Sequence, residues 1–202
     1  MKQKRGQLII LSGPSGAGKG TICEAALKAI PNLKISTSAT TRKPRGTEKN
    51  GVEYFFLSEA AFKKKIENGE FLEYAKVHDH YYGTPKAHIV QMLDKGIDVI
   101  LEIDVQGAAQ IKEKMGYGIT IFIAPPSLQE LQERLVDRKT DSAEQITLRM
   151  KNAQTELKQA QNYDYIIVNR TVDQAVDDLT AILRAEKCRS LNNLEIIQEM
   201  LM

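Results

Sequence analysis

The chain has 202 residues, a length that fits one domain carrying an insertion. Hydrophobic residues make up 42% and charged residues 27%, the ordinary balance of a globular protein with a sizeable core. Lys and Arg number 28 against 26 Asp and Glu, and Trp is absent. The net charge of +2 argues against a protein that binds nucleic acid or acidic membranes through a basic surface.

Targeting and redox signals are weak. The two cysteines, Cys23 and Cys188, have no metal-ligand spacing and are too few for a disulfide framework, which indicates a reducing compartment. The apolar run at residues 8–11 is too short for a signal peptide, and no run is long enough to span a membrane. We therefore expect a cytoplasmic protein with no membrane partner.

Short apolar runs alternate with helical patterns along most of the chain, as in βαβ units. The strand-like runs are residues 8–11, 34–36, 98–104, 119–123 and 165–168. Their continuous apolar character is typical of strands buried on both faces of a parallel sheet. We expect an α/β fold of three layers, with helices on both faces of a central parallel sheet.

Several helices have clear sequence signals. Ser127 with Glu130, and Ser142 with Gln145, each have the spacing of a capping box at a helix start. Further helices are expected over residues 21–30, 58–68, 172–183 and 189–202. The last of these is a tail helix, for which the sequence leaves two uses open: packing onto the body or contacting another subunit.

Residues 36–96 have a different pattern. Strand-like segments at residues 52–57 and 71–77 alternate in polarity and surround the predicted helix at 58–68. Alternation of this kind indicates a small antiparallel or mixed sheet with one solvated face. No Ser-, Gly- or Pro-rich linker borders the region, so we interpret it as an insert on the main sheet.

A glycine-rich loop lies between the first predicted strand and its helix. It consists of Gly13, Pro14, Ser15, Gly16, Ala17, Gly18, Lys19, Gly20 and Thr21. Glycines let successive backbone N–H groups turn toward a phosphate, and the helix N-terminus adds a positive dipole. Lys19 supplies a point charge for the β and γ phosphates. The strand–loop–helix context predicts binding of nucleotide phosphates.

One position departs from the usual phosphate loop, in which Ser or Thr follows the lysine directly and holds Mg²⁺. Here Gly20 follows Lys19, and Thr21 comes one residue later. Either Thr21 takes this part, or Mg²⁺ is held mainly by ATP phosphates and water. The lysine–glycine–threonine order is familiar from nucleoside monophosphate kinases and favours a kinase over a GTPase.

A second candidate anion site lies in residues 36–45, which carry several hydroxyls together with Arg42 and Arg45. Guanidinium groups bind phosphate oxygens through two parallel hydrogen bonds. The segment alone is equally typical of a basic surface loop. Since the glycine-rich loop already binds one phosphate chain, we interpret it as the site of a second phosphorylated ligand.

Successive motifs now point to one family. They are residues 38–45, NGVEY at 50–54, FLEYA at 71–75, YYGT at 81–84, IDVQG at 103–107 and DYIIVN at 164–169. Their order and spacing resemble guanylate kinases over residues 6–188. The resemblance implies a P-loop NTPase-like domain over 6–188, with a GMP-binding insert at about 37–96, a helical lid at about 127–157 and a separate tail at 189–202.

The resemblance also implies ligands for the acceptor. The acceptor phosphate would be bound by Ser38, Arg42, Arg45, Tyr54 and Tyr82. The guanine base would be read by Glu73, Thr84 and Asp104. This is sensible chemistry, because a carboxylate accepts from the N1–H and 2-amino groups that guanine presents, while a threonine hydroxyl donates to O6.

On the ATP side, the resemblance implies that Arg134, Arg138 and Arg149 belong to a lid that closes over the triphosphate. Asn169 resembles a contact on the adenine side, and Glu102 stands near Mg²⁺ where the family often has Asp. Two departures stand out. Lys139 replaces a glycine in the lid turn, and Gly46-Thr47 replaces a proline–glycine pair before Glu48, so that the sequence leaves any role of Glu48 open.

The implied reaction is transfer of the γ-phosphoryl group of ATP to GMP, and to dGMP, with Mg²⁺ as cofactor. Lys19, Arg138 and Arg149 are the expected catalytic residues. Two alternatives stay open at this point: a kinase for another phosphorylated acceptor, and a non-catalytic module that binds peptides. A homo-oligomer is possible. We interpret His78-Asp79-His80 as a turn rather than a metal site.

Overall fold

The computed structural model describes residues 4–77, 79–137 and 142–202. Its centre is a parallel sheet with strand order β2-β7-β1-β8-β9. The strands are β1 (Leu8–Ser12), β2 (Leu33–Ile35), β7 (Asp98–Glu102), β8 (Ile119–Ala124) and β9 (Tyr165–Val168). In register, Ile9 of β1 lies between Ile100 of β7 and Ile119 of β8. The prediction of a central parallel sheet is confirmed.

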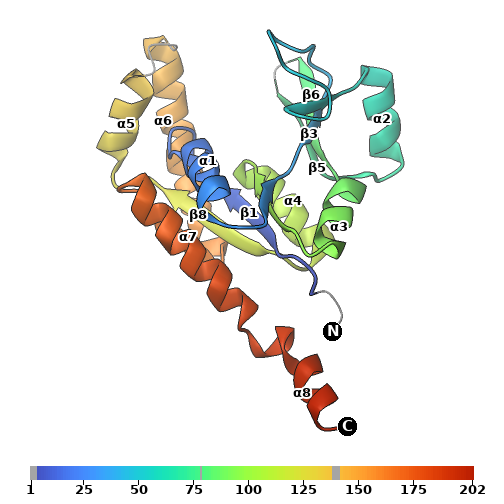
Figure 1. The fold of residues 1–202 in the computed structure, drawn as a ribbon. Coiled ribbons are helices and arrows are strands. Elements are labelled where there is room, and N and C mark those ends of the chain that lie inside the picture. The colour runs from blue at the N-terminus through green and yellow to red at the C-terminus, as the bar shows by residue number, and fades with distance from the viewer. Residues whose placement is uncertain (1–3, 78, 138–141) are drawn as a thin grey trace.

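Helices cover both faces of this sheet, as Figure 1 shows. They include α1 (Lys19–Ala29), α3 (Lys86–Asp94), α4 (Val105–Met115) and α7 (Val172–Lys187). Because successive strand residues point to opposite faces, Ile9 and Leu11 pack against α1 and α7, whereas Leu8 and Ile10 pack in a second cluster with α3 and α4. These two clusters make the three layers that the sequence predicted.

The insert is a four-stranded sheet with order β4-β3-β6-β5. Its strands are β3 (Ser38–Thr40), β4 (Tyr54–Phe56), β5 (Phe71–Val77) and β6 (His80–Pro85). The sheet is mixed, since β3 is parallel to β4 and antiparallel to β6. Helix α2 (Glu59–Glu67) starts at the side-chain cap Ser58 and packs Phe62 against Phe71, with ring centroids 4.4 Å apart.

Two helices, α5 (Leu128–Asp137) and α6 (Ala143–Leu157), form a pair on the side of the molecule opposite the insert (Figure 1). They pack through Leu131, Leu135 and Ala153. The capping box at Ser142 and Gln145 is confirmed. At α5, Ser127 Oγ accepts from the Glu130 N–H at 3.0 Å, while the Glu130 carboxylate forms an ion pair with Arg134.

The tail continues from α7 through a short 3₁₀ turn, Ser190–Asn192, into α8 (Leu194–Met200). In Figure 1 it extends away from the body. Its apolar side chains are exposed rather than packed; they are Leu191, Leu194, Ile196, Ile197, Met200 and Leu201. Of the two uses that the sequence left open, packing onto the body is therefore not the one observed.

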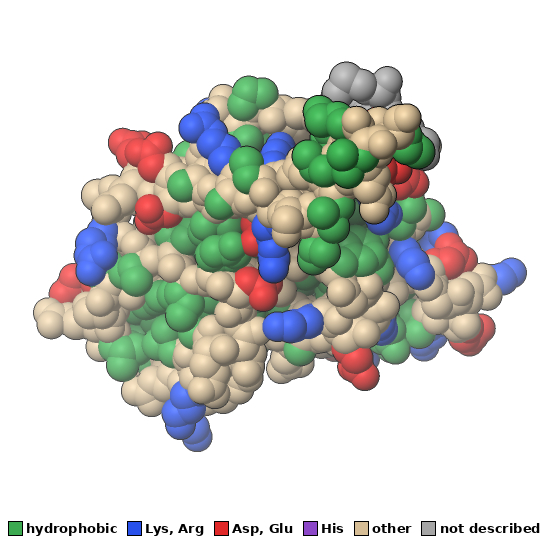
Figure 2. Space-filling view, turned by 90° about the horizontal axis from the view of Figure 1, so that it is seen from below, with side chains coloured by type: hydrophobic (Ala, Val, Ile, Leu, Met, Phe, Trp, Pro, Cys, Tyr) green, Lys and Arg blue, Asp and Glu red, His purple; other side chains and the backbone are tan. Residues whose placement is uncertain are grey.

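The surface agrees with the even charge balance. Seen from below, Lys and Arg side chains are interspersed with Asp and Glu, with hydrophobic side chains between them (Figure 2). No described helix is both long and apolar enough to cross a membrane.

A matched pair of leucines tests this division into body and tail. Leu101 of β7 is fully buried and Leu191 is 77% exposed. We expect Leu101→Ala to lower the free energy of unfolding by about 3–4 kcal/mol, because it leaves a cavity in the core. Leu191→Ala should change it by less than about 0.5 kcal/mol. Urea unfolding followed by circular dichroism measures both, and equal losses would show that the tail belongs to the core.

Candidate active site

The glycine-rich loop joins the end of β1 to α1 and is shaped by close backbone contacts. Gly13 and Gly18 have φ angles of 145° and 91°, which other residues rarely adopt. A β-carbon at Gly13 would lie 2.2 Å from the carbonyl oxygen of Ile123 in β8, and one at Gly18 would lie 2.3 Å from Asn169 Nδ2. The loop is therefore fitted against the ends of β8 and β9 and admits no side chain at either point.

Lys19, the first residue of α1, folds back over this loop. Its Nζ donates to the carbonyl oxygens of Gly13 and Pro14. Burial lowers the pKa of Lys19, and the nearby carboxylates of Glu102, Glu156 and Asp104 act in the opposite direction. Lys19 is thus a partly desolvated cation beside the loop. Its charge would attract a phosphate more strongly there than it would in bulk water.

Asn169 and Arg134 both donate to the Ala17 carbonyl in the backbone of the loop. Asn169 is buried, and its Nδ2 donates to the Ala17 carbonyl at 2.7 Å. Arg134 Nη2 donates to the Asn169 carbonyl at 3.0 Å and pairs with Glu130. Two of the predicted ATP-side residues thus lie together at the phosphate loop, tied to its backbone.

Glu102, which the resemblance puts near Mg²⁺, lies beside the same loop. Glu102 ends β7, and both of its carboxylate oxygens would lie 3.7 Å from a β-carbon at Gly20. Burial raises the pKa of Glu102, opposed by Lys19. Thr21 is exposed one residue further along α1. Among the described residues, no cluster of three or more Asp, Glu, His or Cys side chains could hold a metal ion.

The three predicted base readers meet at the junction of the insert and the main sheet. Glu73 of β5 is buried, and its Oε1 accepts from the Thr84 hydroxyl of β6 at 2.6 Å. Asp104 precedes α4 and accepts from the Gly107 N–H at 2.7 Å. A β-carbon at Gly107 would lie 3.4 Å from Glu73 Oε2 and 3.5 Å from Asp104 Oδ1. Both carboxylates therefore lie beside Gly107, at the start of α4.

Burial raises the pKa of Glu73; the Thr84 hydroxyl opposes this effect, and the Asp104 charge adds to it. A buried carboxylate of this kind is costly unless hydrogen-bond donors reach it. The arrangement can therefore accept from a ligand that brings N–H donors into the space beside Thr84.

The predicted ligands of the acceptor phosphate gather around Arg42. The Arg42 guanidinium carbon lies 5.3 Å from the centre of the Tyr54 ring, and that ring lies 6.1 Å from the Tyr82 ring. Ser38 is the register partner of Tyr54. Arg45 is exposed at the surface of the same loop. The arrangement offers guanidinium and hydroxyl donors to an anion.

Of the predicted lid arginines, Arg134 reaches the loop as described above. Arg149 is half-buried on α6. Arg138, Lys139 and His78 lie outside the described residues.

Two acidic residues near the site were not assigned a role from the sequence. Glu48 forms an ion pair with Arg42 at 2.8 Å. Glu156 of α6 accepts from the Ser15 N–H of the phosphate loop, and burial raises its pKa. Nothing in the sequence around Glu156 indicates a role, because acidic residues are common on surface helices. Glu48 lies within six residues of both Arg42 and Arg45 in the sequence, and this proximity is a signal that it pairs with one of them.

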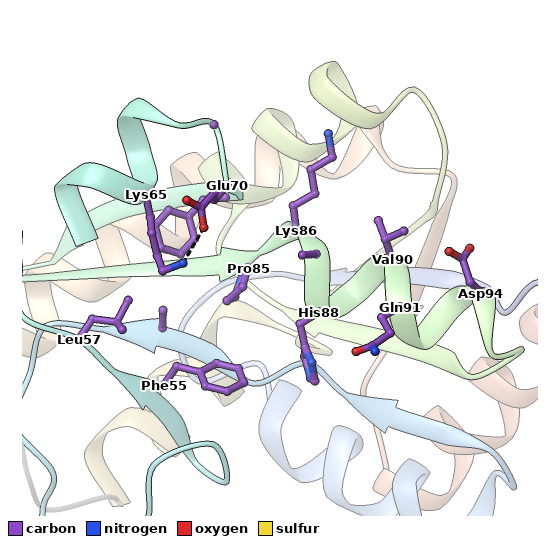
Figure 3. Close-up of a pocket in the computed structure, with 14 residues that line it drawn as sticks. Phe55, Leu57, Lys65, Glu70, Pro85, Lys86, His88, Val90, Gln91 and Asp94 are labelled. Atoms are coloured by element: carbon purple, nitrogen blue, oxygen red, sulfur yellow. Dashed lines mark hydrogen bonds and ion pairs between the residues drawn. The ribbon is translucent and has the colours of Figure 1, made fainter. Parts of the chain in front are cut away.

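A cavity of about 810 Å³ lies elsewhere, between the insert and α3. Figure 3 shows its largely apolar lining, which includes Phe55, Leu57 and Pro85, with the Lys65–Glu70 ion pair at one side. None of the predicted site residues lines it. Polar chemistry rather than cavity size therefore locates the candidate site.

Glycine geometry provides a test of the phosphate loop. Gly18→Ala should weaken binding of a nucleoside triphosphate by about 10- to 100-fold, because the new methyl group displaces Asn169 from the loop. Gly69 is the control, since it also has a positive φ, of 65°, but has no atom within 4 Å of a β-carbon. Gly69→Ala should cost about 1 kcal/mol of stability and leave nucleotide affinity unchanged in calorimetry. Equal affinity for both variants would contradict the fitted loop.

Comparisons with known proteins identify the family. The family model for guanylate kinase matches residues 5–186. The chain is 52% identical to a guanylate kinase of Caldanaerobacter subterraneus subsp. tengcongensis over 194 residues, 96% of this chain and 94% of the relative. It is 50% identical to one of Clostridioides difficile over 196 residues, 97% and 96% of the two chains.

A solved structure gives the same result. The crystal structure of guanylate kinase from Anaplasma phagocytophilum is similar with a TM-score of 0.76 and 34% identity, and the match covers 98% of this chain and 96% of that one. The chain belongs to the guanylate kinase family, the nucleoside monophosphate kinases that phosphorylate GMP at the expense of ATP.

Proposed function

We propose that this chain binds GMP, or dGMP, with Glu73, Thr84 and Asp104 at the base and phosphorylates it from ATP. The observation that supports this most directly is the buried Glu73 carboxylate beside the Thr84 hydroxyl. Guanine brings two N–H donors to the carboxylate and an O6 acceptor to the hydroxyl, whose single hydrogen turns from Glu73 to O6 when the base binds. Adenine presents an unprotonated N1 there and lacks the 2-amino group, so it would leave the buried Glu73 carboxylate without a donor from the base.

ATP is placed at the phosphate loop in this proposal. The backbone N–H groups from Gly13 to Thr21 cradle the phosphates, and Lys19 exchanges its loop carbonyls for phosphate oxygens. Thr21 and Glu102 would help to hold Mg²⁺ beside the phosphates, mainly through water, and the ion would supply charge neutralisation there. Asn169 and Arg134 support the loop from behind.

The acceptor phosphate is bound by Ser38, Arg42, Arg45, Tyr54 and Tyr82. No general base is needed, since a phosphomonoester with a second pKa near about 6 is already ionised at neutral pH. The protein's work is then positioning and charge neutralisation. Lys19, Arg138 and Arg149 gather around the transferred group as the α5–α6 pair closes, and closure excludes water.

The two alternative functions have less support. A non-catalytic module would have no use for the fitted phosphate loop with its half-buried lysine. A kinase for another acceptor would not need the group formed by Glu73, Thr84 and Asp104. We further propose a cytoplasmic enzyme, for which the two free cysteines are typical. The exposed apolar face of α8 favours a homo-oligomer.

Lys19 tests the reaction. Lys19→Met should keep the fold and lower turnover of GMP by about 10²- to 10³-fold, because the transferred group loses a fixed cation. Lys28→Met is the control, since Lys28 is an exposed residue of the last turn of the same helix. A coupled assay that follows ADP release measures both variants. Near-normal turnover of Lys19→Met would remove this lysine from the mechanism.

Glu73 tests the substrate. Glu73→Gln should lower kcat/KM for GMP by about 10- to 100-fold, because one charge-assisted hydrogen bond is lost. ATP binding should not change, and the gap between GMP and AMP should narrow. The assay compares GMP, dGMP, AMP and UMP, with Glu113→Gln on the exposed side of α4 as control. Unchanged discrimination between GMP and AMP would mean that Glu73 does not read the base.

The same variant gives a second readout, in stability. Burial raises the folded-state pKa of Glu73, so its ionised form destabilises the fold above that pKa. Glu73→Gln should therefore raise the melting temperature at neutral pH. The gain should shrink as the pH falls through the raised pKa, where Glu73 itself becomes protonated. Glu113→Gln should show no such trend.

A further inference from the structure

The Arg42 side chain is held by three hydrogen bonds at one end. Its Nη1 donates to the Lys43 carbonyl at 2.8 Å and to Glu48 Oε2 at 2.9 Å, and its Nη2 donates to Glu48 Oε1 at 2.8 Å. The Glu48 carboxylate thus binds the outer edge of the guanidinium with both oxygens. Arg42 is only 9% exposed, which makes this a well-defined pair rather than a loose surface contact.

A guanidinium has five N–H donors. The three bonds use both hydrogens of Nη1 and one of Nη2. The second Nη2 hydrogen and the Nε hydrogen lie side by side on the adjacent edge of the group. These two N–H groups have the spacing to donate two parallel hydrogen bonds to a second oxyanion.

Aromatic side chains hold the guanidinium plane. The guanidinium carbon lies 5.3 Å from the centre of the Tyr54 ring and 5.9 Å from that of the Phe56 ring. The Tyr82 side chain is a further hydrogen-bond partner of the guanidinium. Two of the proposed phosphate ligands, Tyr54 and Tyr82, therefore meet the same guanidinium that Glu48 fixes.

Glu48 also organises the other arginine of the loop. Its Oε2 accepts from the Arg45 N–H at 2.7 Å, so one carboxylate ties the Arg42 side chain to the Arg45 backbone. Hydrogen bonds from Arg42 and from this N–H hold the pKa of Glu48 below its usual value. The carboxylate therefore stays ionised at neutral pH, and the tie is present whenever the loop is folded.

We propose that Glu48 is a positioning residue for the acceptor phosphate. It occupies the outer edge of Arg42 and thereby presents the inner edge, together with Tyr54 and Tyr82, to the phosphate of GMP. The inference rests on the proposed function, since it requires that Arg42 binds that phosphate. The opposite behaviour, in which Glu48 competes with the phosphate for Arg42, is an outcome of the test.

The test compares Glu48→Gln with Glu53→Gln. Glu53 lies in the same segment and accepts from the Lys49 N–H at 2.7 Å, so its substitution removes the same charge without touching Arg42. Calorimetry measures the Kd of GMP, and inhibition kinetics measure the Ki of guanosine, which lacks the phosphate. We expect Glu48→Gln to raise the Kd of GMP by about tenfold and to leave the Ki of guanosine and the KM for ATP unchanged. Glu53→Gln should change none of these three constants.

Three results would overturn the proposal. Tighter GMP binding by Glu48→Gln would show that Glu48 competes with the phosphate. Unchanged GMP binding would show that Arg42 needs no such partner. An equal loss for GMP and guanosine would show a general defect of the loop.

Arg42→Met separates this proposal from the function on which it rests. If that variant weakens GMP binding while Glu48→Gln does not, only the role of Glu48 fails. If Arg42→Met leaves GMP binding unchanged, the proposed phosphate site fails, and the role of Glu48 fails with it.

Discussion

The close approach of the phosphate loop to its neighbours is the constraint on which the rest of the structure depends. Gly13 lies against the backbone of β8, and Gly18 lies against Asn169 at the end of β9. These contacts require β1 to be the central strand, with β8 beside it and β9 paired to the far edge of β8. They also fix the start of α1, and with it Lys19. The buried parallel sheet is therefore what makes the loop rigid enough to be an anion site.

Strand β7 connects this loop to the acceptor side. Glu102, its last residue, lies against the N-terminus of α1, and Asp104, two residues on, lies near Glu73 of the insert. One strand end thus serves both proposed substrates. The negative charges of Glu102 and Glu73 are unfavourable for folding stability, because burial raises the pKa of both carboxyl groups. A cost of this kind is expected where a protein reserves hydrogen-bonding groups for a ligand.

The cations of the site are matched to acidic partners before any nucleotide arrives. Lys19 bonds to loop carbonyls with three carboxylates nearby, Arg42 is paired with Glu48, and Arg134 is paired with Glu130. This pairing lets a chain with a net charge of only +2 concentrate cations at the two proposed anion sites. The positive groups are concentrated by geometry and not by an excess of basic residues.

The sequence by itself determined the parallel sheet, because buried strands have a local apolar pattern. It also located the two segments proposed to bind anions, because such loops are local motifs as well. It missed α3, whose first residue follows Pro85 without a side-chain cap, and α4, since Asp104 was interpreted only as a base ligand although it also caps that helix. Only the tertiary structure decided the pairing of Glu73 with Thr84 and of Arg42 with Glu48. Glu73 and Thr84 meet because β5 and β6 pair, and spacing along the chain does not encode that pairing. Glu48 lies only six residues from Arg42, but it is the fold of the loop that decides that its carboxylate binds that guanidinium.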